Sequence, residues 1–96
     1  MDIGIQPLVL EEIRALARRH GIRKVILFGS RARGDYRPKS DIDLAVSGGD
    51  IDLFRLDVED ETGTLLGFDV VNMDHAVQPE LLESIRKEGQ TLYEEI

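Results

Sequence analysis

The segment from residue 29 to residue 44, GSRARGDYRPKSDIDL, constrains this chain more than any other part of its sequence. An apolar run, VILF, leads directly into its first two residues, Gly29 and Ser30. An apolar run that ends in small residues and a basic helix start predicts a buried strand, a turn and a short helical turn. At the other end of the segment, Asp41 and Asp43 alternate with apolar residues, which predicts a half-buried strand with one polar face.

The two ends of this segment carry groups that phosphate chemistry uses. Backbone amides at a small-residue turn, and in the first turn of a helix, bind anions well. Residues two apart in a strand project from the same face, so the carboxylates of Asp41 and Asp43 can both reach one hard cation. Ordinary surface aspartates on an exposed strand face are the alternative for Asp41 and Asp43 taken alone. The preceding Gly-Ser turn favours a site for a phosphate and a metal ion.

This arrangement resembles the nucleotidyltransferase superfamily that includes DNA polymerase β and kanamycin nucleotidyltransferase. It is most similar to the minimal nucleotidyltransferases, small antitoxin-like proteins encoded beside HEPN-domain partners. The family signature is Gly-Ser, ten residues, Asp-x-Asp, and a third acidic residue on a later strand. The resemblance covers about residues 25 to 93, and the matching positions are Gly29, Ser30, Asp41, Asp43 and Asp69.

The resemblance implies both a fold and an activity. The fold would be α/β (α+β), with a small mixed sheet covered by helices, like the palm of DNA polymerase β. The activity would be metal-dependent transfer of a nucleoside monophosphate, AMP from ATP, to a hydroxyl on a protein. Asp41, Asp43 and Asp69 would be the catalytic residues and would hold Mg²⁺, as two ions. The acceptor would be a HEPN-type toxin, which the chain would neutralise as its antitoxin.

Five residues are candidates for nucleotide binding. Gly29 would let the backbone approach phosphate closely, and Ser30 would donate its hydroxyl and amide or act only as a helix N-cap. Arg31 and Arg33 would either contact phosphate or be exposed helix residues. Ser40 would shape the approach to the metal motif or cap the following strand.

The third carboxylate has two candidates. Asp69 lies within the apolar segment GFDVV, where a carboxylate is costly unless it finds a partner or a metal. Asp74 follows that segment and is more typical of a turn or a helix cap, so we favour Asp69. Neither histidine is expected to be catalytic: His20 suits the end of a helix, and His75 is expected at the surface.

Hydrophobic periodicity predicts alternating helices and strands, and hence one sheet covered by helices. In the helix that starts at Ile51, Leu65 and Leu66 are expected to face inward. Leu92 and Tyr93 would form a closing strand or pack on the sheet. The expected helices cover residues 7–20, 51–66 and 79–87, with a helical turn at 30–33, and the expected strands cover 24–28, 41–46 and 68–73.

Composition narrows the class of protein. With 96 residues, 42% hydrophobic and 32% charged, the chain is expected to form one globular domain, residues 1–96. It has no cysteine, no apolar run near the ~20 residues of a membrane span and no signal-peptide pattern at its N-terminus. We therefore expect a cytoplasmic protein. A net charge of −7 argues against an extended nucleic-acid interface, while the local basic residues between 31 and 39 suit a nucleoside triphosphate.

Three functions remain open from the sequence alone: a nucleotidyltransferase, a non-catalytic module that neutralises a partner by covering it, and a metal-dependent phosphodiesterase. The intact carboxylate set favours an enzyme, and the Gly-Ser turn favours transfer over hydrolysis. We expect no separate acceptor-binding domain within these 96 residues. The acceptor is therefore expected on the open face of the sheet, on a second copy in a homo-oligomer, or on another protein.

Overall fold

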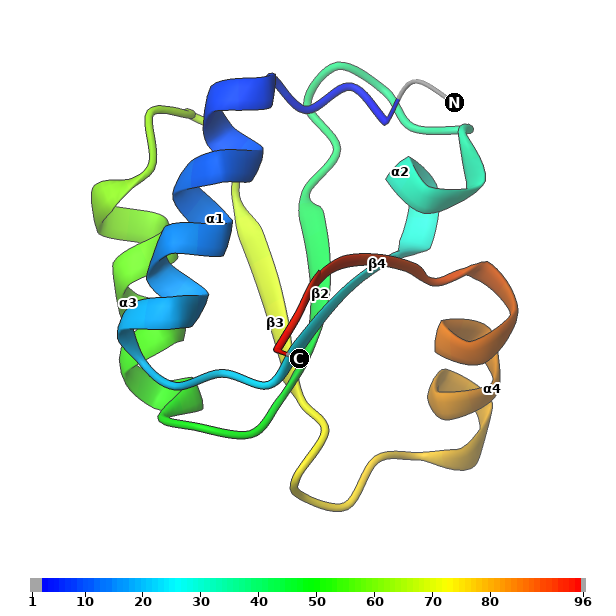
Figure 1. Ribbon diagram of the computed structural model, residues 1–96. Helices are drawn as coiled ribbons and strands as arrows, with labels where there is room; N and C mark the ends of the chain where they lie inside the picture. Colours follow the sequence, from blue (N-terminus) through cyan, green and yellow to red (C-terminus); the bar gives the residue numbers. More distant parts are fainter. Residues whose placement is uncertain (1–2, 96) are drawn as a thin grey trace.

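The computed structural model describes residues 3–95, which form four helices and four strands. Three strands and four helices follow the order expected from the sequence, and a fourth strand closes the chain (Figure 1). The elements are α1 (Pro7–Arg19), β1 (Lys24–Phe28), α2 (Gly29–Arg33), β2 (Ile42–Ser47), α3 (Ile51–Glu61), β3 (Phe68–Asn72), α4 (Pro79–Glu88) and β4 (Gln90–Glu94).

The strands form one mixed sheet in the order β3-β2-β1-β4. Strand β1 is antiparallel to both β2 and β4, whereas β2 and β3 are parallel. The parallel pair needs a crossover, and α3 supplies it (Figure 1). The mixed sheet with helical cover confirms the predicted α/β fold class.

Two apolar clusters hold the helices on the sheet. The larger cluster joins α1 and α3 to one face of the sheet, through residues such as Ile13, Phe54 and Leu44, each fully buried. The smaller cluster joins Ile85 of α4 to Phe28 and Ala45 on the other face. Alternate residues of β2 enter different clusters, as a strand with two covered faces requires.

Helix α1 begins with Pro7 in its first turn, where a missing N–H costs nothing. It ends at Arg19, and Gly21 follows with φ +67°, a left-handed conformation that suits glycine. No helix within residues 3–95 is long and apolar enough to cross a membrane.

The expected length of α3 was wrong. The helix ends at Glu61 instead of continuing to Leu66, and Thr62 at its C-cap is already extended, with ψ 150°. The Thr62 hydroxyl donates to the carbonyl of Val58 (2.6 Å), and the Gly63 amide donates to Glu12 of α1 (2.9 Å). These bonds satisfy groups at the helix end, and the poor helix propensity of glycine favours termination there.

The early end of α3 also changes the expected position of one leucine. Leu65 is fully exposed instead of facing inward, whereas Leu66 packs against the larger apolar cluster as predicted. The expected closing segment at Leu92 and Tyr93 is a strand, β4, on the free edge of β1.

These two neighbouring leucines provide a matched test of the fold. We expect Leu66→Ala to lower the free energy of unfolding by about 1–2 kcal/mol, because it removes packed apolar surface. Leu65→Ala should change it by less than ~0.5 kcal/mol, as for other exposed positions. Urea unfolding of both variants measures the difference, and equal losses would contradict the end of α3 at Glu61.

Candidate functional site

The sheet brings the predicted carboxylates to one end. Because β2 and β3 are parallel, they begin at the same edge, and Asp43 lies directly opposite Asp69 in register. Asp41 immediately precedes β2. The antiparallel partner β1 ends there too, since Phe28 pairs with Asp43 and Gly29 follows. Three strands thus bring the turn at Gly29 and Ser30, called the phosphate turn below, and all three aspartates to one end of the sheet.

Glycine is required where the turn meets the carboxylates. Gly29 has φ +76°, and a Cβ built on it would overlap Oδ2 of Asp43. A Cβ at Gly67, just before β3, would lie 2.8 Å from Oδ1 of Asp41. Asp43 therefore lies against the end of β1, whereas Asp41 lies against the start of β3. The two glycines leave the space that these carboxylates occupy.

The carboxylate of Asp43 is destabilised where it stands. Burial raises its pKa above the ordinary value, and the negative charges of Asp69 and Asp41 raise it further. The positive charges of Arg33 and Arg31 partly offset this effect. A carboxylate in this environment gains from any cation that comes close to it.

No cation of the protein meets this need by direct pairing. In the part of the chain from residue 3 to residue 95, no Lys, Arg or His forms an ion pair with Asp41, Asp43 or Asp69. Nor, within that part, do three or more His, Cys, Asp or Glu side chains form a ready-made metal cluster. The carboxylate of Asp43 lies beside Gly29 after β1, and that of Asp41 lies beside Gly67 before β3.

Asp74 lies away from these carboxylates. The amide of Met73, next to it, bonds to Val46, which is four residues along β2 from Ile42, or roughly 13 Å at the usual strand rise. The Asp74 carboxylate accepts from the amide of Gly48 (2.9 Å) in the turn after β2. Asp74 thus has the turn role expected of it, and His75 beside it is exposed as predicted.

The remaining polar candidates surround the phosphate turn. Ser30 is half-buried inside α2, so it is not the helix N-cap, which is Phe28. Arg33 pairs with Asp35 (3.2 Å) and with Glu88 of α4 (2.9 Å), which ties α2 to α4. The Ser40 hydroxyl accepts from the amide of Arg37 (2.8 Å), a bond within the loop before β2.

Arg31 is neither an exposed helix residue nor a side chain open to solvent at the phosphate turn. Its relative exposure is 1%, and its guanidinium donates to the carbonyls of Ile3, Gly4, Pro38 and Ser40. The sequence-based alternative of an exposed helix residue is therefore wrong for Arg31, whereas a phosphate contact stays a prediction. Its short spacing from Gly29 suggested a phosphate contact, but the contacts that bury it come from segments that periodicity does not identify.

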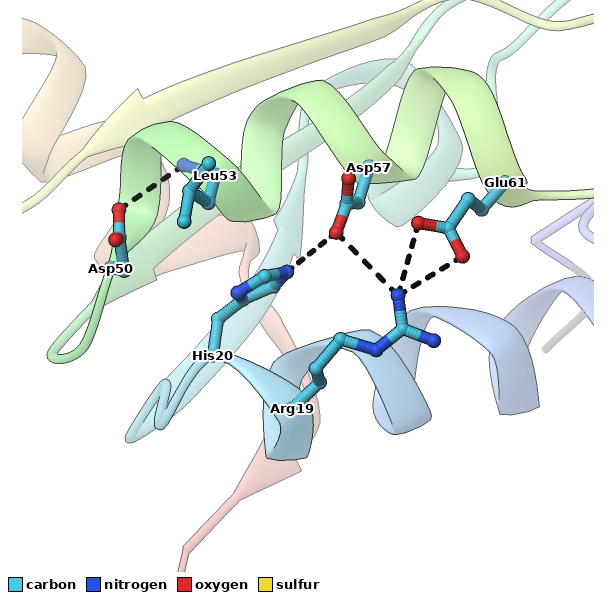
Figure 2. A network of polar contacts seen from close by, with 6 residues as sticks. All are labelled: Arg19, His20, Asp50, Leu53, Asp57 and Glu61. Atoms are coloured by element: carbon cyan, nitrogen blue, oxygen red, sulfur yellow. Dashed lines mark hydrogen bonds and ion pairs between the residues drawn. The ribbon is translucent and has the colours of Figure 1, made fainter.

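His20 has a structural pairing that the sequence did not indicate. Its Nε2 lies 2.6 Å from Oδ2 of Asp57 on α3, and Arg19 beside it pairs with Glu61 (3.0 Å) (Figure 2). Figure 2 also shows Asp50 capping α3 by accepting from the amide of Leu53 (3.2 Å). The contacts of His20 and Arg19 join the end of α1 to α3, whereas the Asp50 contact lies within the first turn of α3.

A groove of about 610 Å³ lies beside the start of β3. It runs between the N-terminal segment, the loop before β2 and the loop after α3. Its lining is Gly4, Ile5, Gln6, Val9, Pro38, Lys39 and residues 63–67. Gly67 belongs to this lining, and a Cβ built on it would lie 2.8 Å from Oδ1 of Asp41, so the groove lies beside Asp41. No motif in the sequence indicated it.

Comparisons with known proteins agree with this geometry. Residues 11–95 match the family model "Polymerase beta, Nucleotidyltransferase". The chain is 39% identical over 82 residues to "Putative protein adenylyltransferase MJ0604" of Methanocaldococcus jannaschii, covering 75% of this chain and 79% of that protein.

Solved structures share the fold. A "putative minimal nucleotidyltransferase" superimposes with a TM-score of 0.70 at 31% identity, over 94% of this chain and 95% of that one. A toxin–antitoxin structure with AMP-PNP superimposes with a TM-score of 0.70 at 24% identity, over 90% of this chain and 73% of that one.

The crowded carboxylates give a prediction about stability. Asp43→Asn should raise the melting temperature of the protein in EDTA by a few degrees at pH 7–8. The reason is that a raised pKa in the folded state means that the ionised carboxylate costs stability. That cost should shrink as the pH falls through the folded pKa, and vanish below the ordinary value of about 3.9. Scanning calorimetry between pH 4 and pH 8 measures the gain.

Asp52→Asn is the matched control. It removes the same unit of charge from an exposed carboxylate in the first turn of α3. We expect no gain, because an acidic residue near a helix N-terminus is mildly stabilising. An Asp43→Asn gain that did not depend on pH, or that Asp52→Asn matched, would contradict the destabilised carboxylate.

Proposed function

Because the chain belongs to the Polymerase beta nucleotidyltransferase family, and is therefore a nucleotidyltransferase, we propose that it transfers AMP from ATP to a hydroxyl on a protein. The observation that carries this proposal is the register of the sheet: Asp43 faces Asp69 across the parallel pair, next to the turn at Gly29. One edge thus has groups for both the phosphates and the reacting centre.

The reaction needs little covalent participation from the protein. The acceptor oxygen attacks the α-phosphorus, a new P–O bond forms, and the bond to pyrophosphate breaks. Asp69 is exposed and can take the proton of the attacking hydroxyl. Catalysis then depends mainly on position and electrostatics.

Asp41, Asp43 and Asp69 would hold Mg²⁺, which takes oxygen ligands. The unpaired carboxylates and the raised pKa of Asp43 fit this cation chemically. When bound, Mg²⁺ stabilises negative charge on the attacking and leaving oxygens. The side chains of Asp41 and Asp43 would turn from their glycine contacts toward the ion.

The turn at Gly29 and Ser30 would receive the β- and γ-phosphates on its backbone amides. A side chain at Gly29 would overlap Asp43, so the bare backbone at this position keeps room for carboxylate and phosphate together. Arg33 is half-exposed and its charge already reaches Asp43. It would be the basic side chain nearest to a bound triphosphate, if released from Asp35 or Glu88.

Two relatives support AMP as the transferred group. The M. jannaschii protein is named as a protein adenylyltransferase, and the toxin–antitoxin structure of the same fold contains AMP-PNP. A protein acceptor also agrees with the net charge of −7, which disfavours a long nucleic-acid acceptor.

The partner we propose is a HEPN-type toxin, with this chain as its antitoxin. Fold neighbours include an MntA–HepT toxin–antitoxin complex, which superimposes with a TM-score of 0.68 at 21% identity. An acidic protein would associate fastest with a basic partner, since complementary charge steers encounter. AMP attached to the toxin would block its substrate site.

The test is co-expression of the chain with the toxin candidate encoded beside it, scored by growth and by the intact mass of the partner. We expect a mass gain of one or more AMP units with the wild type. The double variant Asp41→Asn/Asp43→Asn should bind the toxin but lose transfer by orders of magnitude, because these carboxylates act as a unit.

Binding and catalysis give different results in this experiment. Full neutralisation by the double variant without any mass change would show a non-catalytic module that acts by covering its partner. Release of free AMP with no labelled protein from α-labelled ATP would instead show hydrolysis. Calorimetry with ATP and Mg²⁺ measures nucleotide binding independently of the acceptor.

Asp69 and Asp74 form a second matched pair. Asp69→Asn should lower the rate of transfer by about 100-fold or more, because it removes a proton acceptor, with a smaller effect on ATP affinity. Asp74→Asn should transfer at the wild-type rate, because Asp74 lies at the far end of β3. Single-turnover rates and ATP titrations of both variants decide this, and the reverse pattern would identify Asp74 as the third carboxylate.

A further inference from the structure

Arg31 is the largest side chain among the fully buried residues, and the buried residues within 3–95 include no other polar or charged one. Its charge cannot be removed by losing a proton, because the guanidinium stays protonated in proteins. Burial of a charge is costly unless the surroundings satisfy it. The chain therefore bears a cost at a position where an apolar residue would fill the same space.

The guanidinium is satisfied by carbonyl oxygens. Nε and Nη2 donate to Ser40 (3.1 and 2.8 Å), and Nη2 also donates to Pro38 (3.3 Å). Nη1 donates to Ile3 (3.2 Å) and Gly4 (3.0 Å). Among residues 3–95, no carboxylate forms an ion pair with Arg31. Its planar face lies 4.7 Å from the centre of the Tyr36 ring.

These contacts connect three parts of the site. Arg31 lies in α2, two residues after Gly29 of the phosphate turn. Ser40, whose carbonyl accepts two of its bonds, immediately precedes Asp41. Ile3 and Gly4 belong to the N-terminal segment, outside the residues that match the family model. One side chain thus joins the phosphate turn, the start of the metal motif and the chain terminus.

We propose that Arg31 is a positioning residue that fixes Asp41 relative to the phosphate turn, with the N-terminal segment at Ile3 and Gly4 as part of the same assembly. This inference rests on the proposed transfer function, since it gives Asp41 a role there. Lysine could not replace arginine, because a single ammonium cannot reproduce the planar fork that spans these carbonyls.

The first test is Arg31→Lys, which keeps the charge and loses the fork. The Mg²⁺ concentration for half-maximal transfer should rise about 10- to 100-fold, the usual effect of removing a group that orients a metal ligand. The KM for ATP should change little. Backbone amides of residues 39–42 should exchange hydrogen faster in the metal-free protein, a readout that needs no activity.

Val58→Ala is the control for a loss of stability alone. Val58 is fully buried on α3, and its hydrogen bond from the Thr62 hydroxyl lies at the end of that helix. It should lower the melting temperature and leave the Mg²⁺ requirement unchanged. Adding methylguanidinium to Arg31→Ala should restore part of the wild-type Mg²⁺ response, whereas the same concentration of ammonium should not.

If Arg31 variants fail to fold, Gly4→Ala tests the same assembly from its other side. A Cβ at Gly4 would overlap the Tyr36 ring and lie 2.6 Å from Nη1 of Arg31. Gly21→Ala is its matched control, since Gly21 has nearly the same φ (+67° against +70°) but open space around a Cβ. Only Gly4→Ala should raise the Mg²⁺ requirement and the exchange rates at residues 39–42.

The outcomes separate this inference from the proposed function. A wild type that transfers nothing overturns the function, while the exchange rates still decide whether Arg31 holds the segment before Asp41. An active Arg31→Lys with wild-type exchange and Mg²⁺ response overturns the positioning role. A raised KM for ATP with an unchanged Mg²⁺ requirement would overturn it too, and would identify Arg31 as a phosphate ligand.

Discussion

The hydrogen-bonded register of β2 between β1 and β3 is the constraint on which the site depends. Its antiparallel partner ends, and its parallel partner begins, at the edge where β2 starts. A slip of one residue would turn Asp43 toward the apolar core and Leu44 toward the site. The burial of Ile42, Leu44 and Val46, all fully inaccessible, opposes such a slip. The apolar face of β2 therefore specifies the position of its polar face.

Asp43 occupies an unfavourable position for an ionised carboxylate, and this feature bears on the metal chemistry proposed for the site. Burial and two neighbouring carboxylates hold the pKa of Asp43 above its ordinary value, and no basic side chain within residues 3–95 pairs with it. A lysine or arginine paired there would remove this cost, but it would also compete with a metal ion. The unfavourable electrostatics around the ionised Asp43 would therefore favour binding of a cation beside it.

Local sequence signals predicted much of this arrangement. The bounds of β1 follow from the four-residue apolar run VILF between Lys24 and Gly29. The alternation of Ile42, Leu44 and Val46 predicted one buried face of β2, although Ala45 on the other face is buried as well. Asp69 could be chosen over Asp74 because the apolar pattern places it inside a strand. The family resemblance added what periodicity cannot: that β2 and β3 lie side by side, which brings Asp69 opposite Asp43.

What the sequence could not predict are the contacts between distant segments. The α3 terminus depends on the bond from Gly63 to Glu12, 51 residues earlier. The pairing of His20 with Asp57 depends on the packing of α1 against α3 (Figure 2). Neither contact leaves a periodic signal in its own segment. The expected helix therefore extended beyond the actual end of α3, and His20 was expected only to suit the end of a helix.

Arg31 illustrates the same limit at the site itself. Beside a glycine turn, an arginine has a ready explanation as a phosphate ligand, and only the fold reveals the carbonyls that surround it. Its hydrogen bonds reach segments 27 and 28 residues earlier in the chain and seven and nine residues later, and neither set leaves a periodic signal around Arg31.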